Sequence, residues 1–303
     1  MLDKLKTHYK DALMIGFTPH LKEQYYWYLS EDGTTFGIDK KKLTDDQASL
    51  LSTLFRHMEN QSTPMNEEQK AWFNYLYKPQ HPSLTVNKTI QSVRFIHFQT
   101  NKPISEPNEF SEAIHAMFPY DMILLWENDS QGVIIDTHID QKEEFPINFE
   151  EMSDTITTDF YVTIRFFIGQ VYSFHKEIQA DFHWEKLCFN KSLRFLSNRI
   201  IFKLHEILPY MILEEVDPAL KKKLTDSILQ ELQQDKELLS TVKVFLESNL
   251  NVSLAAKKLY MHRNSLQYRI DKFIEKTGVD IKHFQGAITT YLAIINHEQF
   301  LDS

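Results

Sequence analysis

The segment Ser253 to Ile270, SLAAKKLYMHRNSLQYRI, brings together side chains that form hydrogen bonds with nucleic acids. Arginine pairs with guanine and asparagine with adenine in the major groove, while lysine, serine and tyrosine hold backbone phosphates. A helix surface that displays these side chains could therefore read base edges and grip the phosphate backbone. The candidate DNA contacts, which extend to Lys272, are Ser253, Lys257, Lys258, His262, Arg263, Asn264, Ser265, Gln267, Tyr268, Arg269 and Lys272.

Three helices are predicted to position these side chains. A first helix over 238–246 ends at Asn249 to Asn251, and Ser253 is a natural N-cap for a short helix over 254–259. A longer helix is expected from His262 to Lys276, with Gly278 in the C-cap position.

The helix over 262–276 has two chemically different faces. At about 100° per residue, its apolar and its hydrogen-bonding side chains lie on roughly opposite sides. The pairing of a short helix, a tight turn and a helix with one apolar face indicates a helix-turn-helix, in which Ala255 and Ala256 allow close crossing. The apolar set is Leu266, Ile270, Phe273 and Ile274, and the opposite set is Asn264, Ser265, Tyr268 and Lys272.

This segment closely resembles the C-terminal helix-turn-helix of PucR/CdaR-type bacterial transcriptional regulators. The family pattern is an alanine-rich helix, then His-Arg-Asn-Thr/Ser-Leu-x-Tyr-Arg, then a basic helix ending in Thr-Gly. The resemblance covers about sixty residues and implies a transcriptional regulator that binds DNA. The matching positions are His262, Arg263, Asn264, Ser265, Leu266, Tyr268, Arg269, Thr277 and Gly278, with Ser265 at the usual threonine position.

The charge distribution agrees with a DNA-binding module on an acidic body. The chain has a formal net charge of −9, but residues 236–282 hold nine Lys or Arg and five Asp or Glu. That span therefore carries +4 and the remainder −13. A basic surface can attract a polyanion even when the total charge is negative, although an ordinary solvated helix surface also fits these counts.

The middle of the chain, residues 89–191, alternates between strand and helix patterns in the order β-α-β-β-α-β-α. This order predicts a ferredoxin-like domain with helices on one face of the sheet. The layout resembles the degenerate cyclase-like domain of some bacterial regulators. At the central hairpin turn, where active diguanylate cyclases carry a glycine pair and metal-binding acids, this chain has only Glu127 and Asp129 as acids, without the glycine pair. We expect this domain to be non-catalytic.

The first 88 residues resemble no named module. Two aromatic runs around Asp32-Gly33 predict a hairpin over 25–39, and Thr44 is the expected N-cap of a helix. Thr63 and Pro64 are expected to start a further helix that places Trp72, Tyr75 and Leu76 on one face. The aromatic residues of 25–36 and 72–77 fit core packing better than a ligand pocket.

After Lys191 the chain is predicted to be helical to its end, with a connector over 192–235 that could mediate oligomerisation. Its apolar stripe would consist of Leu193, Phe195, Leu196, Ile200, Ile201, Leu204 and Ile207.

Several classes of site are not expected. Cys188 is the only cysteine, which excludes an intramolecular disulfide and a cysteine-based zinc cage. Asp136, His138 and Asp140 could face one side of a strand, but solvent-facing polar alternation is the better interpretation because no second cluster completes a metal site. No catalytic residue, metal or cofactor is predicted. The sequence has no signal peptide and no transmembrane stretch, so we expect a cytoplasmic protein.

These observations predict an α+β chain: an N-terminal region over 1–88, a ferredoxin-like domain over 89–191, the connector, and an all-α DNA-binding domain over 236–303. The expected function is sequence-specific regulation of transcription, without membrane contact. The partners would be double-stranded promoter DNA, further copies of the chain and a small-molecule effector. Two alternatives stay open: a nucleotide-processing or nucleotide-binding protein that uses the cyclase-like domain, and a scaffold whose helix-turn-helix binds protein.

Overall fold

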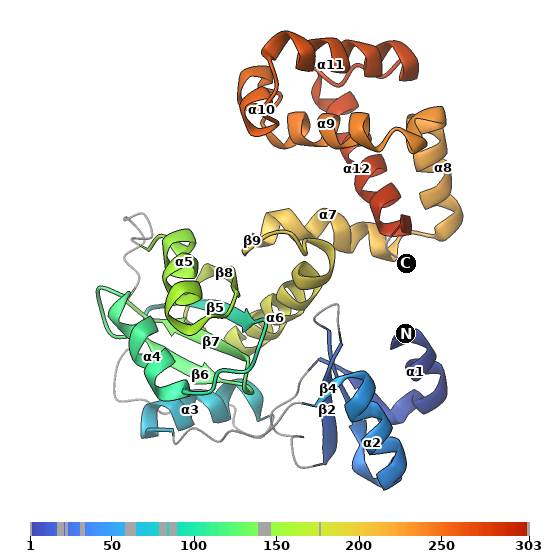
Figure 1. Ribbon diagram of the computed structural model, residues 1–303. Helices are drawn as coiled ribbons and strands as arrows, with labels where there is room; N and C mark the ends of the chain where they lie inside the picture. Colours follow the sequence, from blue (N-terminus) through green and yellow to red (C-terminus); the bar gives the residue numbers. More distant parts are fainter. Residues whose placement is uncertain are drawn as a thin grey trace. The chain divides into compact units, whose positions relative to one another are not determined.

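A computed structural model describes residues 2–16, 21, 24–30, 34–57, 65–78, 84, 90–138, 147–175 and 177–301. The chain divides into two compact units, Met1–Ile207 and Leu208–Ser303. Sheets and helices alternate in the first unit, whereas the second is all helical (Figure 1). The predicted α+β class is confirmed.

The N-terminal part of the first unit holds a four-stranded antiparallel sheet in the order β1-β3-β2-β4. The predicted hairpin is confirmed, since Tyr25 pairs with Asp39 and Leu29 with Thr35. Its turn, with Asp32 and Gly33, lies outside the described residues. The elements are α1 (Leu2–Tyr9), β1 (Leu13–Ile15), β2 (Tyr25–Leu29), β3 (Thr35–Asp39), α2 (Asp45–Leu54) and β4 (Arg56–His57).

Two capping boxes fix where helices begin in this region. Thr44 caps α2 as predicted, and the Gln47 side chain accepts a hydrogen bond from the Thr44 backbone amide. Helix α3 (Glu67–Tyr77) begins later than the sequence suggested, because its cap is Asn66, whose side chain accepts from the Gln69 amide. The predicted start at Thr63 and Pro64 is therefore wrong, and both residues lie outside the described part of the chain.

A five-stranded sheet forms the core of the middle region, in the order β6-β7-β5-β8-β9. The first four strands pair antiparallel, as in a ferredoxin-like fold, and β9 is added parallel to β8. The ferredoxin-like prediction is confirmed. The elements are β5 (Ser92–Thr100), α4 (Pro107–Ala116), β6 (Ile123–Trp126), β7 (Gln131–Asp136), α5 (Phe149–Phe160), β8 (Ile164–Ser173), α6 (Ile178–Phe195) and β9 (Ile201–Lys203).

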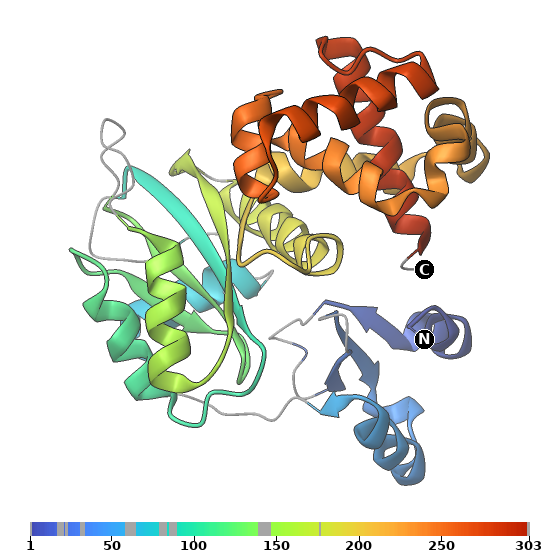
Figure 2. The same ribbon diagram turned by 45° about the horizontal axis from the view of Figure 1, so that its top comes forward.

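Helices cover both faces of this sheet, not one face as expected. Helices α4 and α5 pack on one face through Phe110 and Phe149 (Figure 2). Helices α3 and α6 pack on the other, through Trp72 and Phe182. The strands alternate apolar side chains to both sides, so a second layer is required. The aromatic residues of 72–77 take part in this core and those of 25–36 in the N-terminal cores, which confirms core packing.

The predicted helical stripe from Leu193 to Ile207 is wrong. Helix α6 ends at Phe195, and strand β9 pairs with β8, so that Ile201 lies opposite Phe166 and Lys203 opposite Ile168. Phe202 is fully buried. Part of this apolar run therefore completes the sheet of its own chain.

The second unit is a bundle of helices whose core lies between α8, α9, α10, α11 and α12. Leu239, Val242 and Phe245 of α9 are buried in it. The helices are α7 (Leu204–Glu215), which begins in the first unit, α8 (Pro218–Leu229), α9 (Lys236–Glu247), α10 (Val252–Lys258), α11 (Arg263–Thr277) and α12 (Phe284–Leu301). Among the described residues, no helix combines the length and apolarity needed to cross a membrane.

Candidate nucleic-acid interface

The helix-turn-helix is formed by α10, a four-residue connection and α11. Helix α10 is capped by Asn251, whose side chain accepts hydrogen bonds from the amides of Ser253 and Leu254 at 3.0 Å. Ser253 is therefore inside the helix and is not its cap, contrary to the sequence-based prediction. Asparagine is at least as good a cap as serine, and the cap fixes the start of the helix.

Both ends of α11 are fixed by local hydrogen bonds. At its start, Nδ1 of His262 accepts from the amide of Asn264 at 3.3 Å. At its end, Gly278 has φ +68° and its amide bonds to the Ile274 carbonyl. The predicted C-cap at Gly278 is confirmed, and each end of the helix lies one residue later in the chain than the predicted limits of 262–276. His262, placed among the candidate DNA contacts, is exposed and also serves as the N-cap.

The inner face of α11 packs into the core of the second unit. Leu266, Ile270 and Phe273 are fully buried, as is Ala255 of α10, and Ala256 is nearly so. These positions belong to one apolar cluster. The predicted apolar face is confirmed, and the opposite face of α11 is directed to the surface.

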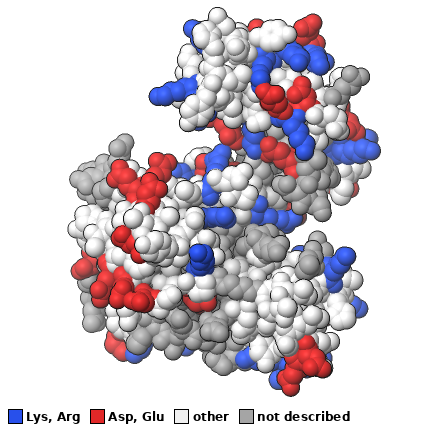
Figure 3. Space-filling view, viewed as in Figure 1, with Lys and Arg blue, Asp and Glu red and all other residues white. Residues whose placement is uncertain are grey.

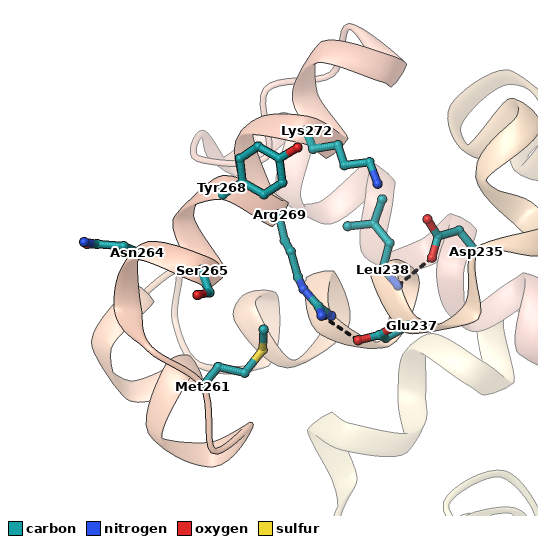
Figure 4. A pocket seen from close by; sticks show the side chains of 9 residues that line it. All are labelled: Asp235, Glu237, Leu238, Met261, Asn264, Ser265, Tyr268, Arg269 and Lys272. Carbon is teal, nitrogen blue, oxygen red and sulfur yellow. Dashed lines mark hydrogen bonds and ion pairs between the residues drawn. The ribbon is translucent and has the colours of Figure 1, made fainter.

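Five of the predicted contacts, Arg269 among them, line a surface groove with a volume of about 720 Å³. Asn264, Ser265, Tyr268 and Lys272 project from α11, and the start of α9 forms the other side (Figure 4). Tyr268 is 69% exposed. This arrangement places one amide, two hydroxyls and one ammonium group on a single accessible face.

Besides the N-cap His262, two further predicted contacts have side-chain partners within the protein. The Arg269 guanidinium bonds to the Glu237 carboxylate at 2.5 Å and to the Thr241 hydroxyl at 3.0 Å, both on α9. Gln267 donates to Asp271 at 3.0 Å. The other predicted residues are exposed: Ser253, Lys257 and Lys258 on α10, and Arg263 at the first position of α11.

Tyr260 and Met261 also lie at this surface, although the sequence pattern did not mark them as candidates. Tyr260 has φ +52° in the connection between α10 and α11, and its side chain is 98% exposed. Met261 lines the groove. A left-handed aromatic residue in a tight turn is unusual, but a sequence does not reveal a positive φ unless glycine or asparagine occupies the position.

Charges of both signs cover the second unit. Lys and Arg are interspersed with Asp and Glu on the face shown, whereas acidic side chains gather over α4 and α5 of the first unit (Figure 3). On α11, the hydrogen bond from Lys282 lowers the pKa of Asp271 below its usual value. The lysine pairs with this carboxylate at 2.8 Å, so part of the positive charge is neutralised internally.

The hairpin turn of the ferredoxin-like domain is buried. Glu127 is 7% exposed, accepts a hydrogen bond from the Tyr77 hydroxyl and pairs with Lys186 at 3.0 Å. The Asn128 side chain accepts from the amides of Ser130 and Gln131, which shapes the turn. Asp129 is also buried. The two acids at the position where active diguanylate cyclases bind metal are thus part of the packed interior.

The predicted polar motif that begins at the last residue of β7 is divided between interior and surface. Asp136 is fully buried and accepts from the Tyr120 hydroxyl at 2.9 Å, and His138 is exposed and stacks on the Tyr120 ring. Asp140 lies outside the described residues. Solvent-facing alternation is therefore wrong for Asp136. The described residues include no cluster of three or more metal-ligating side chains.

Comparison with known proteins identifies the second unit. Residues 238–295 match the PucR C-terminal helix-turn-helix domain. The chain is 30% identical over 264 residues to the Bacillus subtilis protein YxkF, covering 86% of this chain and 87% of that one.

Two named regulators of Bacillus subtilis share a shorter segment. The chain is 39% identical over 77 residues to the purine catabolism regulatory protein, covering 24% of this chain and 14% of that protein. It is 33% identical over 63 residues to the proline-responsive transcriptional activator PutR, covering 21% and 15%.

Proposed function

Because this chain belongs to the PucR/CdaR-type family of bacterial transcriptional regulators, we propose that its helix-turn-helix binds promoter DNA and reads its sequence. The observation that carries this proposal is the two-sided character of α11. One side is buried in the core, and the other presents Asn264, Ser265, Tyr268 and Lys272 along an open groove. Such a helix fits the major groove of B-DNA.

The position of each side chain suggests its role. Arg263 and Asn264 occupy the first turn of α11, the end that meets base edges in this type of motif. Lys272 lies two turns further on, where a phosphate contact is favoured. The remaining polar side chains are suited to contacts with the phosphate backbone of DNA. They are Ser253, Lys257 and Lys258 on α10, and Ser265, Gln267 and Tyr268 on α11.

Replacing Arg263 or Asn264 by alanine should abolish reading of one base position. Each variant is expected to lose about 1–3 kcal/mol of discrimination, because a bidentate base contact is removed. Folding should be nearly unchanged because both side chains are exposed. The measurement is the affinity of the full chain for a duplex selected from random DNA and for its scrambled counterpart, together with a melting curve.

Lys272→Ala is the control that separates the loss of a base contact from the loss of a phosphate contact. It should weaken binding to both duplexes equally and lower the slope of log affinity against log salt by about one. If Arg263→Ala and Asn264→Ala bind the selected duplex as tightly as the parent, α11 does not read the sequence. If the parent binds neither duplex, the scaffold alternative is favoured.

We propose that the chain acts as a dimer or larger assembly. A single helix-turn-helix rarely buries enough surface for tight specific binding, and paired motifs read half-sites one helical turn apart. Sedimentation of the full chain at micromolar concentration should show an assembly larger than the 35.9 kDa chain. Only monomer, with and without DNA, would contradict this expectation.

The upstream part of the chain is proposed to sense a small-molecule effector and to support assembly, without catalysis. Burial of Glu127 and its pairing with Lys186 argue against a nucleotide-processing site at the hairpin turn. A regulator that binds the bacterial chromosome acts in the cytoplasm, where we place this protein.

A further inference from the structure

Arg269 connects the two helices that border the groove. Its Nη1 donates to the Thr241 hydroxyl and its Nη2 to the Glu237 carboxylate. Glu237 and Thr241 are four residues apart and therefore share one face of α9. The two ends of a planar guanidinium are thus held by two acceptors, a geometry that fixes orientation as well as distance.

The partners of Arg269 are themselves oriented. Thr241 is 2% exposed and donates its hydroxyl proton to the Glu237 carbonyl at 2.8 Å, which leaves the oxygen to accept from Arg269. Glu237 lies in the first turn of α9, whose start is capped by Asp235. An anionic side chain is favoured there by the helix dipole.

This contact fixes the rotation of α11 about its own axis, which the apolar core of the motif restrains only weakly. Leu266, Ile270 and Phe273 hold α11 against the core, but apolar packing has little directional preference for small rotations about the helix axis. Rotation would carry Asn264 and Tyr268 away from their places beside the groove. A polar contact on the flank of α11 opposes that rotation.

We propose that Arg269 is a positioning residue that locks the rotation of α11 through Glu237 and Thr241, and is not a DNA contact. This inference rests on the proposed DNA-binding function and revises the role expected for Arg269 from the sequence. Its charge also offsets that of Glu237, which together with Asp235 gives the α9 side of the groove an acidic character. DNA phosphates approaching the groove therefore meet one less uncompensated carboxylate.

Arg269→Lys is the decisive variant because it keeps the positive charge but loses the planar guanidinium, which donates to two acceptors at once. If Arg269 orients α11, then Arg269→Lys and Glu237→Gln should each lower the ratio of selected-duplex to scrambled-duplex affinity by about fivefold. Since both weaken the same ion pair between Arg269 and Glu237, the double variant should lose little more than either single one. The slope against salt should stay unchanged in Arg269→Lys.

Amide hydrogen exchange of α11 without DNA tests the lock independently of DNA binding. Exchange should rise by about fivefold in both single variants and no further in the double variant. Lys272→Gln, a charge removal on the outer face of the same helix, should leave exchange unchanged and lower the salt slope. If the parent fails to discriminate between duplexes, the proposed function fails while exchange still decides the role of Arg269.

Two results would overturn the positioning role. One is normal discrimination by both Arg269→Lys and Glu237→Gln, with Arg269→Gln losing affinity for both duplexes and one unit of salt slope. That pattern describes a phosphate contact. The other is unchanged hydrogen exchange in Arg269→Lys, in Glu237→Gln and in the double variant. That result would show that the contact does not hold α11.

Discussion

Leu266→Ala is expected to lower the free energy of unfolding of the helical unit by about 2–5 kcal/mol. The side chain is fully buried among Ala255, Ile270 and Phe273, in the core cluster that joins α10 and α11. Truncation removes its apolar contacts and leaves a cavity that fixed helices fill poorly. DNA binding should be lost only in proportion to the unfolded fraction.

Leu254→Ala is the matched control for this change. It is the same substitution in the same motif, but Leu254 is 42% exposed on α10. Its effect on stability should therefore stay below about 1 kcal/mol. Thermal and urea unfolding of the full chain would compare the two variants. Equal stabilities would mean that Leu266 is not a core residue.

The helix-turn-helix could be predicted from the sequence because its determinants are local. The 3.6-residue period of Leu266, Ile270 and Phe273 specifies the buried face, and Gly278 specifies the end of the helix. The order of strands and helices along residues 89–191 could also be predicted from the sequence. Strands β5 to β8 each have a continuous apolar pattern bounded by turn residues.

Contacts between distant segments could not be predicted. Strand β9 has three residues, too few for a period, and it is recognised only by its pairing with β8. The second helical layer on the five-stranded sheet includes α3, which precedes β5 by more than a dozen residues. Arg269 fits the outer-face pattern, yet its partners lie on α9, 28 and 32 residues earlier.

A second large effect on stability is expected from a substitution of Glu185, in the ferredoxin-like domain. It is fully buried on α6 beneath Gly169 of β8. Its Oε1 accepts from the Gln170 amide at 2.7 Å and from the Tyr172 hydroxyl at 2.9 Å. Its Oε2 accepts no hydrogen bond from the residues that the structure describes. A carboxylate in this place is poorly solvated.

Burial raises the pKa of Glu185 from 4.5 to about 7, against the opposing effects of the hydrogen bonds from Gln170 and Tyr172 and the charge of Arg94. Because the folded state binds the proton more tightly than the unfolded state, this group costs stability as the pH rises from about 4.5 to 7. The cost at alkaline pH is about 3 kcal/mol.

Glu185→Gln should therefore be increasingly more stable than the parent as the pH rises. The difference between their free energies of unfolding is expected to grow by about 2–3 kcal/mol between about pH 5 and pH 8. The comparison isolates Glu185, because burial also keeps the pKa of His97 well below its usual value and that effect is common to both proteins. The glutamine keeps an oxygen for Gln170 and Tyr172, so the packing should survive. A difference that stays constant with pH would show that Glu185 titrates normally, and that water reaches the carboxylate beneath Gly169.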